Sequence, residues 1–141
     1  MSAKNGFAST PLPNGLAIAG TDQKGKLVTS LIKQDSLGKL NYTAALAFAN
    51  AQTNVSPSVA IITNDAMHCC WTDHKDYQLR YADLNIEQKT WSPIQKKHGA
   101  TTTRSTVVCR PFQNDEVFYF SETGKDIVNY TQGSGNQYGP A

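Results

Sequence analysis

The sequence predicts an all-β protein, and two patterns carry the prediction. Apolar residues alternate, or run in short β-branched and aromatic stretches bounded by Gly, Asn, Asp and Pro, as in strands separated by turns. Helical spacing is confined to residues 42–50, whose alanines predict one short helix. The 141 residues suit a single domain with its own hydrophobic core.

The expected strands recur in three units. Residues 39–43, 78–82 and 127–131 each place a tyrosine two positions after an aliphatic residue: Tyr42, Tyr81 and Tyr130. An apolar strand precedes each of them, at residues 27–31, 67–71 and 117–121, and a further apolar segment precedes that, at 16–19, 59–62 and 106–109. The order predicts three blade-like repeats, near 10–52, 53–98 and 99–141. The alternative is a chance likeness among β-hairpins.

The middle unit carries a family resemblance over residues 57–95. Its motifs are Pro57-Ser58-Val59-Ala60, Met67-His68-Cys69-Cys70-Trp71, Gln78-Leu79-Arg80-Tyr81 and Thr90-Trp91-Ser92-Pro93. They resemble one blade of the β-propeller lectins of bacteria and fungi, in the tectonin-like and fucose-lectin-like groups. The third unit lacks the closing Trp, and the first lacks both. His68 and Tyr81 also stand where fucose-reading blades carry Arg and Glu, so the fucose triad is not carried over.

Three propeller-type blades do not close a ring by themselves. Propellers have four or more blades, and an open stack would leave sheet faces and edges uncovered. We therefore expect closure by oligomerisation, most simply as a homodimer with six blades, or as another homo-oligomer. Residues 7–9 or the tail after Tyr130 are candidates to complete a blade across the joint.

The resemblance implies a metal-independent, multivalent lectin whose shallow sites lie between neighbouring blades. Sugars present apolar C–H faces and many hydroxyls, so a site needs an aromatic platform beside hydrogen-bonding groups. The candidate carbohydrate-binding residues are the aromatics Trp91, Trp71 and Tyr81 and the polar residues Arg80, Glu87, Asn41 and Asn129. For each aromatic the alternative is packing in the core between blades.

Composition and motifs favour glycans over other partners. A net charge of +2, with 17% charged residues, predicts neither a nucleic-acid nor a membrane partner. No apolar run has the length of a membrane span or a signal peptide, so we expect a cytoplasmic protein or one released without a signal peptide. No nucleophile elbow, P-loop or dinucleotide fingerprint is present, which predicts a non-enzyme without cofactors.

The cysteines and histidines lack the spacing of a metal site. Cys69, Cys70 and Cys109 are expected to be buried thiols, and His68 and His74 add no CxxC or HxxxH pattern, so no metal is predicted. Two other functions stay open. One is a protein–protein interaction module, and the other is a small enzyme or binding protein with an apolar β-barrel cavity lined by Phe112, Phe118, Phe120 and Trp71.

Overall fold

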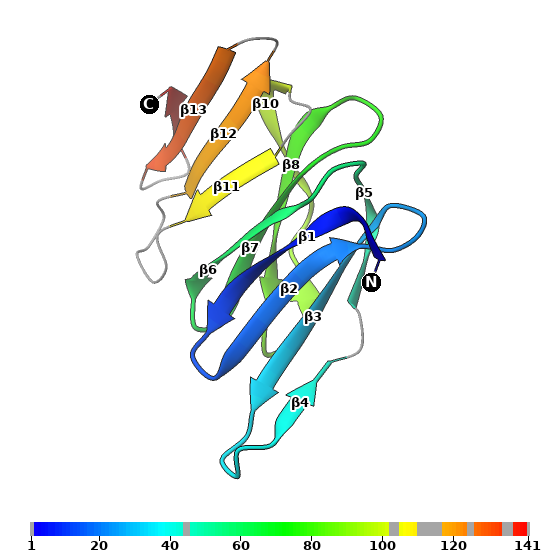
Figure 1. The fold of residues 1–141 in the computed structure, drawn as a ribbon. Helices are drawn as coiled ribbons and strands as arrows, with labels where there is room; N and C mark the ends of the chain where they lie inside the picture. The colour runs from blue at the N-terminus through cyan, green and yellow to red at the C-terminus, as the bar shows by residue number, and fades with distance from the viewer. Residues whose placement is uncertain are drawn as a thin grey trace.

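The computed structural model is all-β (Figure 1). It describes residues 2–43, 46–101, 105–109, 117–123, 126–133 and 137–140. Side chains are described between residues 5 and 95, except at 44, 45, 49, 62 and 79, and beyond residue 95 the description is of the backbone. The described residues form three antiparallel sheets, each built from one continuous stretch of the chain.

Sheet I is a meander of the first five strands. Its members are β1 (Ser2–Leu12), β2 (Gly15–Thr21), β3 (Lys26–Gln34), β4 (Leu40–Tyr42) and β5 (Leu46–Gln52). The order is β1-β2-β3-β4, and β5 also pairs with β3. The fourth position of this sheet is therefore shared by two short strands.

The short helix predicted over residues 42–50 is wrong, because β5 occupies most of that stretch. Ala47 pairs with Val28 of β3 and Leu46 with Thr29. Phe48 and Ala51 are buried while Ala47 is exposed. Burial of Phe48 in an extended strand outweighs the helix propensity of the alanines around it.

Sheet II repeats the arrangement of sheet I. It contains β6 (Ser58–Thr63), β7 (Ala66–Thr72), β8 (Gln78–Asn85), β9 (Thr90–Trp91) and β10 (Gln95–Thr101). The order is β6-β7-β8-β10, with β9 also pairing with β8, so its fourth position is again shared by two strands.

Sheet III is a four-stranded meander of β11 (Ser105–Cys109), β12 (Val117–Thr123), β13 (Asp126–Gly133) and β14 (Gln137–Pro140). The strand β11 contacts β6 and β7, and β12 contacts β10. Sheet III therefore lies beside sheet II, and Figure 1 shows it at the end of the molecule away from β3 and β4.

Sheets I and II pack against each other around one hydrophobic core. Strand register places Ala17 beside Leu31 and Ala19 beside Thr29, on the face of sheet I that meets sheet II. The facing side chains of β7 are alternate residues, and all are fully buried: Met67, Cys69 and Trp71. Removal of this apolar surface from water is the main force holding the two sheets together.

Two Asx turns connect strands of sheet I, one between β2 and β3 and one between β3 and β4. Asp22 Oδ1 accepts the backbone N–H groups of Lys24 and Lys26, and Gly25 takes a positive φ of 80°. Residues 35–39 form the same Asp-x-x-Gly-Lys turn between β3 and β4, with Gly38 also at φ 80°. An aspartate that bonds its own backbone and a glycine that tolerates positive φ are what such a turn requires.

The predicted alignment of the three repeat tyrosines is off by one strand in the first unit. Tyr81 and Tyr130 lie in third strands, β8 and β13, whereas Tyr42 lies in β4 at the edge of sheet I. Sheet I begins at Ser2 rather than at residue 10. Phe7 pairs with Gly20 of β2, so residues 7–9 complete the sheet of their own chain.

Candidate functional site

A groove of ≈ 340 Å³ lies where the edge of sheet I meets the turn between β8 and β9. One wall comes from β3, β4 and Thr43, and the other from the residues after β8. Its lining residues are Leu31, Lys33, Asn41, Tyr42, Thr43, Ile86, Glu87 and Lys89.

The turn at Asp35 orients the first wall. Asn41 Nδ2 donates to Asp35 Oδ2 at 3.3 Å and to the Lys39 carbonyl at 3.5 Å. The pKa of Asp35 lies below its ordinary value, chiefly because the Lys39 N–H donates to the carboxylate, with further donation from Asn41 and Leu37. The ionised carboxylate therefore fixes the amide of Asn41 beside the groove.

A second Asx turn shapes the opposite wall. Asn85 Oδ1 accepts the N–H of Gln88 at 2.8 Å, and the Asn85 carbonyl accepts the N–H of Lys89. Lys89 has a positive φ of 57°, which is uncommon for a residue with a Cβ. This conformation ends β8 and leaves Glu87 exposed at the groove while Ile86 is buried.

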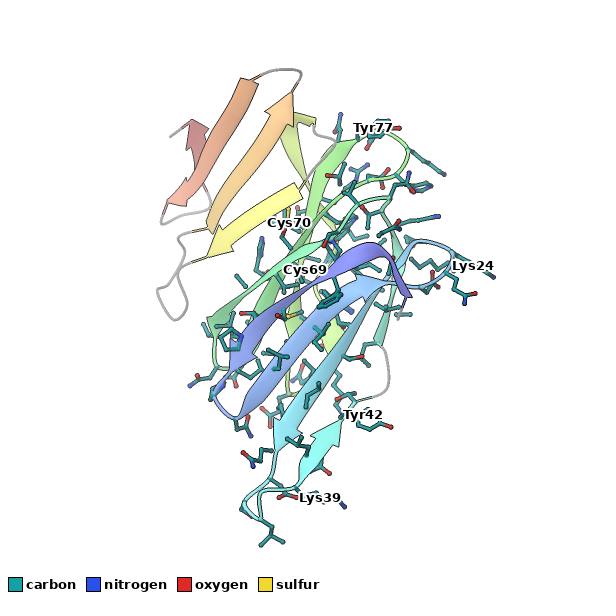
Figure 2. The ribbon with its side chains drawn as sticks, in the orientation of Figure 1. Lys24, Lys39, Tyr42, Cys69, Cys70 and Tyr77 are labelled. Atoms are coloured by element: carbon teal, nitrogen blue, oxygen red, sulfur yellow. The ribbon has the colours of Figure 1, made fainter. Side chains whose placement is uncertain are left out.

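The groove joins an apolar floor to a polar rim. Leu31 and Ile86 are buried, whereas Tyr42 is 81% exposed and lies at the edge of the molecule (Figure 2). The rim carries an amide, a carboxylate, a phenol and the ammonium groups of Lys33 and Lys89. Such a surface can hydrogen-bond to several hydroxyls while contacting a small apolar face.

Two of the predicted carbohydrate-binding residues meet in this groove, although they are distant in sequence. Asn41 comes from β4 and Glu87 from the turn after β8. No sequence motif links the two residues. The packing of sheet I against sheet II brings them to one site.

The predicted role of Trp71 as a sugar platform is wrong for this structure. Trp71 is 0% exposed, and its ring meets Phe48 edge to face at a centroid distance of 5.6 Å. Trp91 is half-buried and stacks on the same phenylalanine at 4.5 Å. Both tryptophans therefore pack sheet II on sheet I, with Phe48 in contact with each of them.

Arg80 and Tyr81 are not among the residues that line the groove. Arg80 pairs with Asp76 at 2.7 Å and with Asp73 at 3.8 Å, which ties β8 to the turn before it. The ring of Tyr81 lies 5.4 Å from that of His68. Asn129 lies in β13, but its side chain is outside the described residues, as are those of Phe118 and Phe120 and the whole of Phe112.

The groove residues that sequence reasoning missed are Tyr42, Lys33 and Lys89. Tyr42 was predicted as a repeat tyrosine and not as a rim residue. One sequence signal could have indicated Tyr42. The Asp-x-x-Gly-Lys motif of residues 22–26 recurs at residues 35–39, where it predicts a turn that ends β3 and is followed by the short strand that carries Tyr42. The contribution of Lys89 depends on packing between sheets, which no local motif reveals.

Three further findings concern a second pocket, metal binding and membrane spans. A second pocket of ≈ 280 Å³ lies at the opposite end of the contact between the sheets, near Gln52 and His74. Among the described residues, His, Cys, Asp and Glu form no group of three or more that could hold a metal ion. Within the same part of the chain, no helical segment has the length and hydropathy needed to cross a bilayer.

Comparison with known proteins adds no family assignment. A scan with protein-family models gives no match for this chain, and a search of curated proteins gives none either.

Proposed function

We propose that this protein is a carbohydrate-binding lectin that binds glycans, without a metal, in the groove between sheets I and II. The observation that carries the proposal is the meeting of Asn41, Glu87 and the exposed Tyr42 around one groove of ≈ 340 Å³. The position agrees with the expectation, drawn from the resemblance to propeller lectins, that sites lie between neighbouring blades. The protein would be cytoplasmic or released without a signal peptide.

The sheet arrangement supports a blade interpretation. Propeller blades are four-stranded sheets arranged around a central channel. Each sheet here is an antiparallel meander from one stretch of chain, and the first strand β6 contacts the first strands β1 and β11 on either side. In the proposal the three sheets are three blades, with their first strands innermost, and oligomerisation closes the ring.

The groove chemistry suits a neutral or acidic sugar. The amide of Asn41 and the carboxylate of Glu87 supply a donor and acceptors for hydroxyl pairs. Lys33 and Lys89 add donors that would also attract a sugar carboxylate. A shallow site of this size binds weakly, and the several copies in an oligomer would raise the strength of attachment to a glycan-coated surface.

A glycan array followed by calorimetric titration tests the proposal. We expect the wild type to bind a defined subset of glycans, and Asn41→Ala and Tyr42→Ala each to weaken binding of the best glycan about tenfold, the loss of about 1.4 kcal/mol of contact energy. Lys24→Ala is the matched control, because Lys24 lies on the turn at the opposite end of β3 (Figure 2). Absence of array binding, or equal binding by all four proteins, would refute the site.

A further inference from the structure

One face of sheet I keeps most of its apolar side chains at least partly exposed. Alternation along β1, β2, β3 and β5 places a set of apolar residues opposite the core face: Phe7, Pro11, Leu16, Ile18, Ile32 and Ala47. These six side chains are half-buried or exposed, and Phe7 is 62% exposed, whereas Val28, which lies on the same face beside Ala47, is buried at 5%. We call this the open face of sheet I. A contiguous exposed apolar face commonly marks an interaction site.

Matching turns show which part of sheet II corresponds to the open face. Asp22 and Asp73 follow the second strands of their sheets, and each accepts backbone N–H groups within its own turn. The residues before them, Thr21 and Thr72, pair with Leu27 and Leu79. Aligning the two threonines makes Ile18 the counterpart of Cys69.

The two-residue turns at 13–14 and 64–65 give the same alignment, with Gly15 opposite Leu12 and Ala66 opposite Thr63. Leu16 then corresponds to Met67. In sheet II, Met67 and Cys69 are fully buried against sheet I. The open face of sheet I therefore corresponds to the face of sheet II that carries Met67 and Cys69, and in sheet II that face is covered by a neighbouring sheet.

The opposite faces of sheets I and II also correspond to each other. Ala17 and Ala19 correspond to His68 and Cys70 in this alignment. The first pair is buried against sheet II, and the second pair is buried on the side of sheet II away from sheet I. The strand β11 contacts β6 and β7, and because sheet I covers the other side of sheet II, we infer that β11 lies on this side. Sheets I and II thus turn the same kind of face toward the next sheet along the chain, and sheet II turns the other kind toward the previous sheet.

In the row of sheets I, II and III, two faces have no neighbouring sheet within the described part of the chain. They are the open face of sheet I and the side of sheet III away from sheet II. We propose that the open face of sheet I docks on sheet III of a second copy of this chain, repeating the packing of sheet I on sheet II. Two copies related by a twofold axis make this contact twice and close a ring of six sheets. The inference rests on the blade arrangement of the proposed function and names the partner and the surface.

Molar mass in solution tests the docking surface, by sedimentation equilibrium on the full chain. We expect twice the 15.4 kDa mass of one chain. Phe7→Glu and Ile18→Arg place charges on the open face and should halve the measured mass. Leu37→Arg is the matched control and should keep the dimer mass, because Leu37 is 92% exposed on the turn between β3 and β4.

Circular dichroism checks that each variant keeps its β structure, and Phe7→Glu alters a side chain exposed enough to leave the core intact. A wild type with the mass of one chain or of three or more chains overturns the proposal, as does a folded Phe7→Glu variant that stays dimeric. Glycan titration of the same samples separates the two claims. A monomer that binds glycans refutes only the docking, and a dimer that binds none refutes only the lectin function.

Discussion

Phe48 of β5 stacks on Trp91 of β9, with ring centroids 4.5 Å apart and planes inclined by 13°. The same phenylalanine meets Trp71 edge to face. One residue of sheet I is thus held between the two tryptophans of sheet II, and this cluster fixes how the two sheets sit over the core. The groove opens at the margin of the same contact.

Phe48→Ala should lower the free energy of unfolding by about 3–5 kcal/mol, because it removes a buried ring and leaves a cavity beside both tryptophans. Urea denaturation followed by tryptophan fluorescence measures the change. Leu37→Ala, at an exposed turn, is the control and should change stability by less than about 0.5 kcal/mol. Equal losses in the two variants would contradict the interpretation of Phe48 as the contact between sheets.

Gly25→Ala should destabilise the fold more than Gly38→Ala. Both glycines have φ of 80°, so each alanine carries a similar backbone strain of about 1–2 kcal/mol. A Cβ at Gly25 would lie 3.1 Å from the Thr53 carbonyl oxygen, whereas one at Gly38 would meet only a flexible glutamine amide at 3.5 Å. Thermal denaturation of both variants checks the difference, and identical melting temperatures would show that the Thr53 backbone yields without cost.

Cys69 should resist alkylation in the native protein. Burial, with a smaller effect of the Asp83 charge, raises the pKa of its thiol far above the ordinary value, so the reactive thiolate is not formed in the folded state near neutral pH. Iodoacetamide labelling resolved by peptide mass spectrometry should show modification of Cys69 only as urea unfolds the chain. Rapid labelling of Cys69 without denaturant would contradict its place in the core.

Acid should weaken the fold partly through Asp35. Its folded-state pKa is lowered below the ordinary 3.8, so its stabilising effect is present above that value and is lost as pH falls through the folded-state pKa. Stability of the wild type should therefore fall more steeply below about pH 4 than that of Asp35→Asn. Urea titrations at several pH values measure the two slopes, and parallel slopes would show that the turn at Asp35 does not depend on its charge.

Local pattern was enough to predict the all-β class, because alternation and turn residues are short-range properties. The alanines before Asn50 favour a helix by propensity alone, and only the tertiary contact of Phe48 explains why that stretch is a strand. The alignment of Tyr42 with Tyr81 failed for a related reason. An aliphatic residue followed by tyrosine is common in strands, and it marks no particular strand of a sheet.

The site was predictable only in part. Asn41 and Glu87 were expected to bind sugar, but their meeting depends on how sheet I packs on sheet II. Large aromatic residues suit both a sugar platform and a core, so the sequence could not distinguish the buried Trp71 from the exposed Tyr42. Burial of the large Trp71 ring between the two sheets lowers the free energy of the folded state, and this explains why Trp71 is a core residue rather than a sugar platform.

Nuclear magnetic resonance titration with the best glycan from the array tests the central claim most directly. We predict that amide shifts move at the groove, over residues 41–43 and 86–89 and at Lys33, while the second pocket near Gln52 and His74 stays unchanged. Shift changes centred on the second pocket, or no change at glycan saturation, would contradict the proposed lectin site.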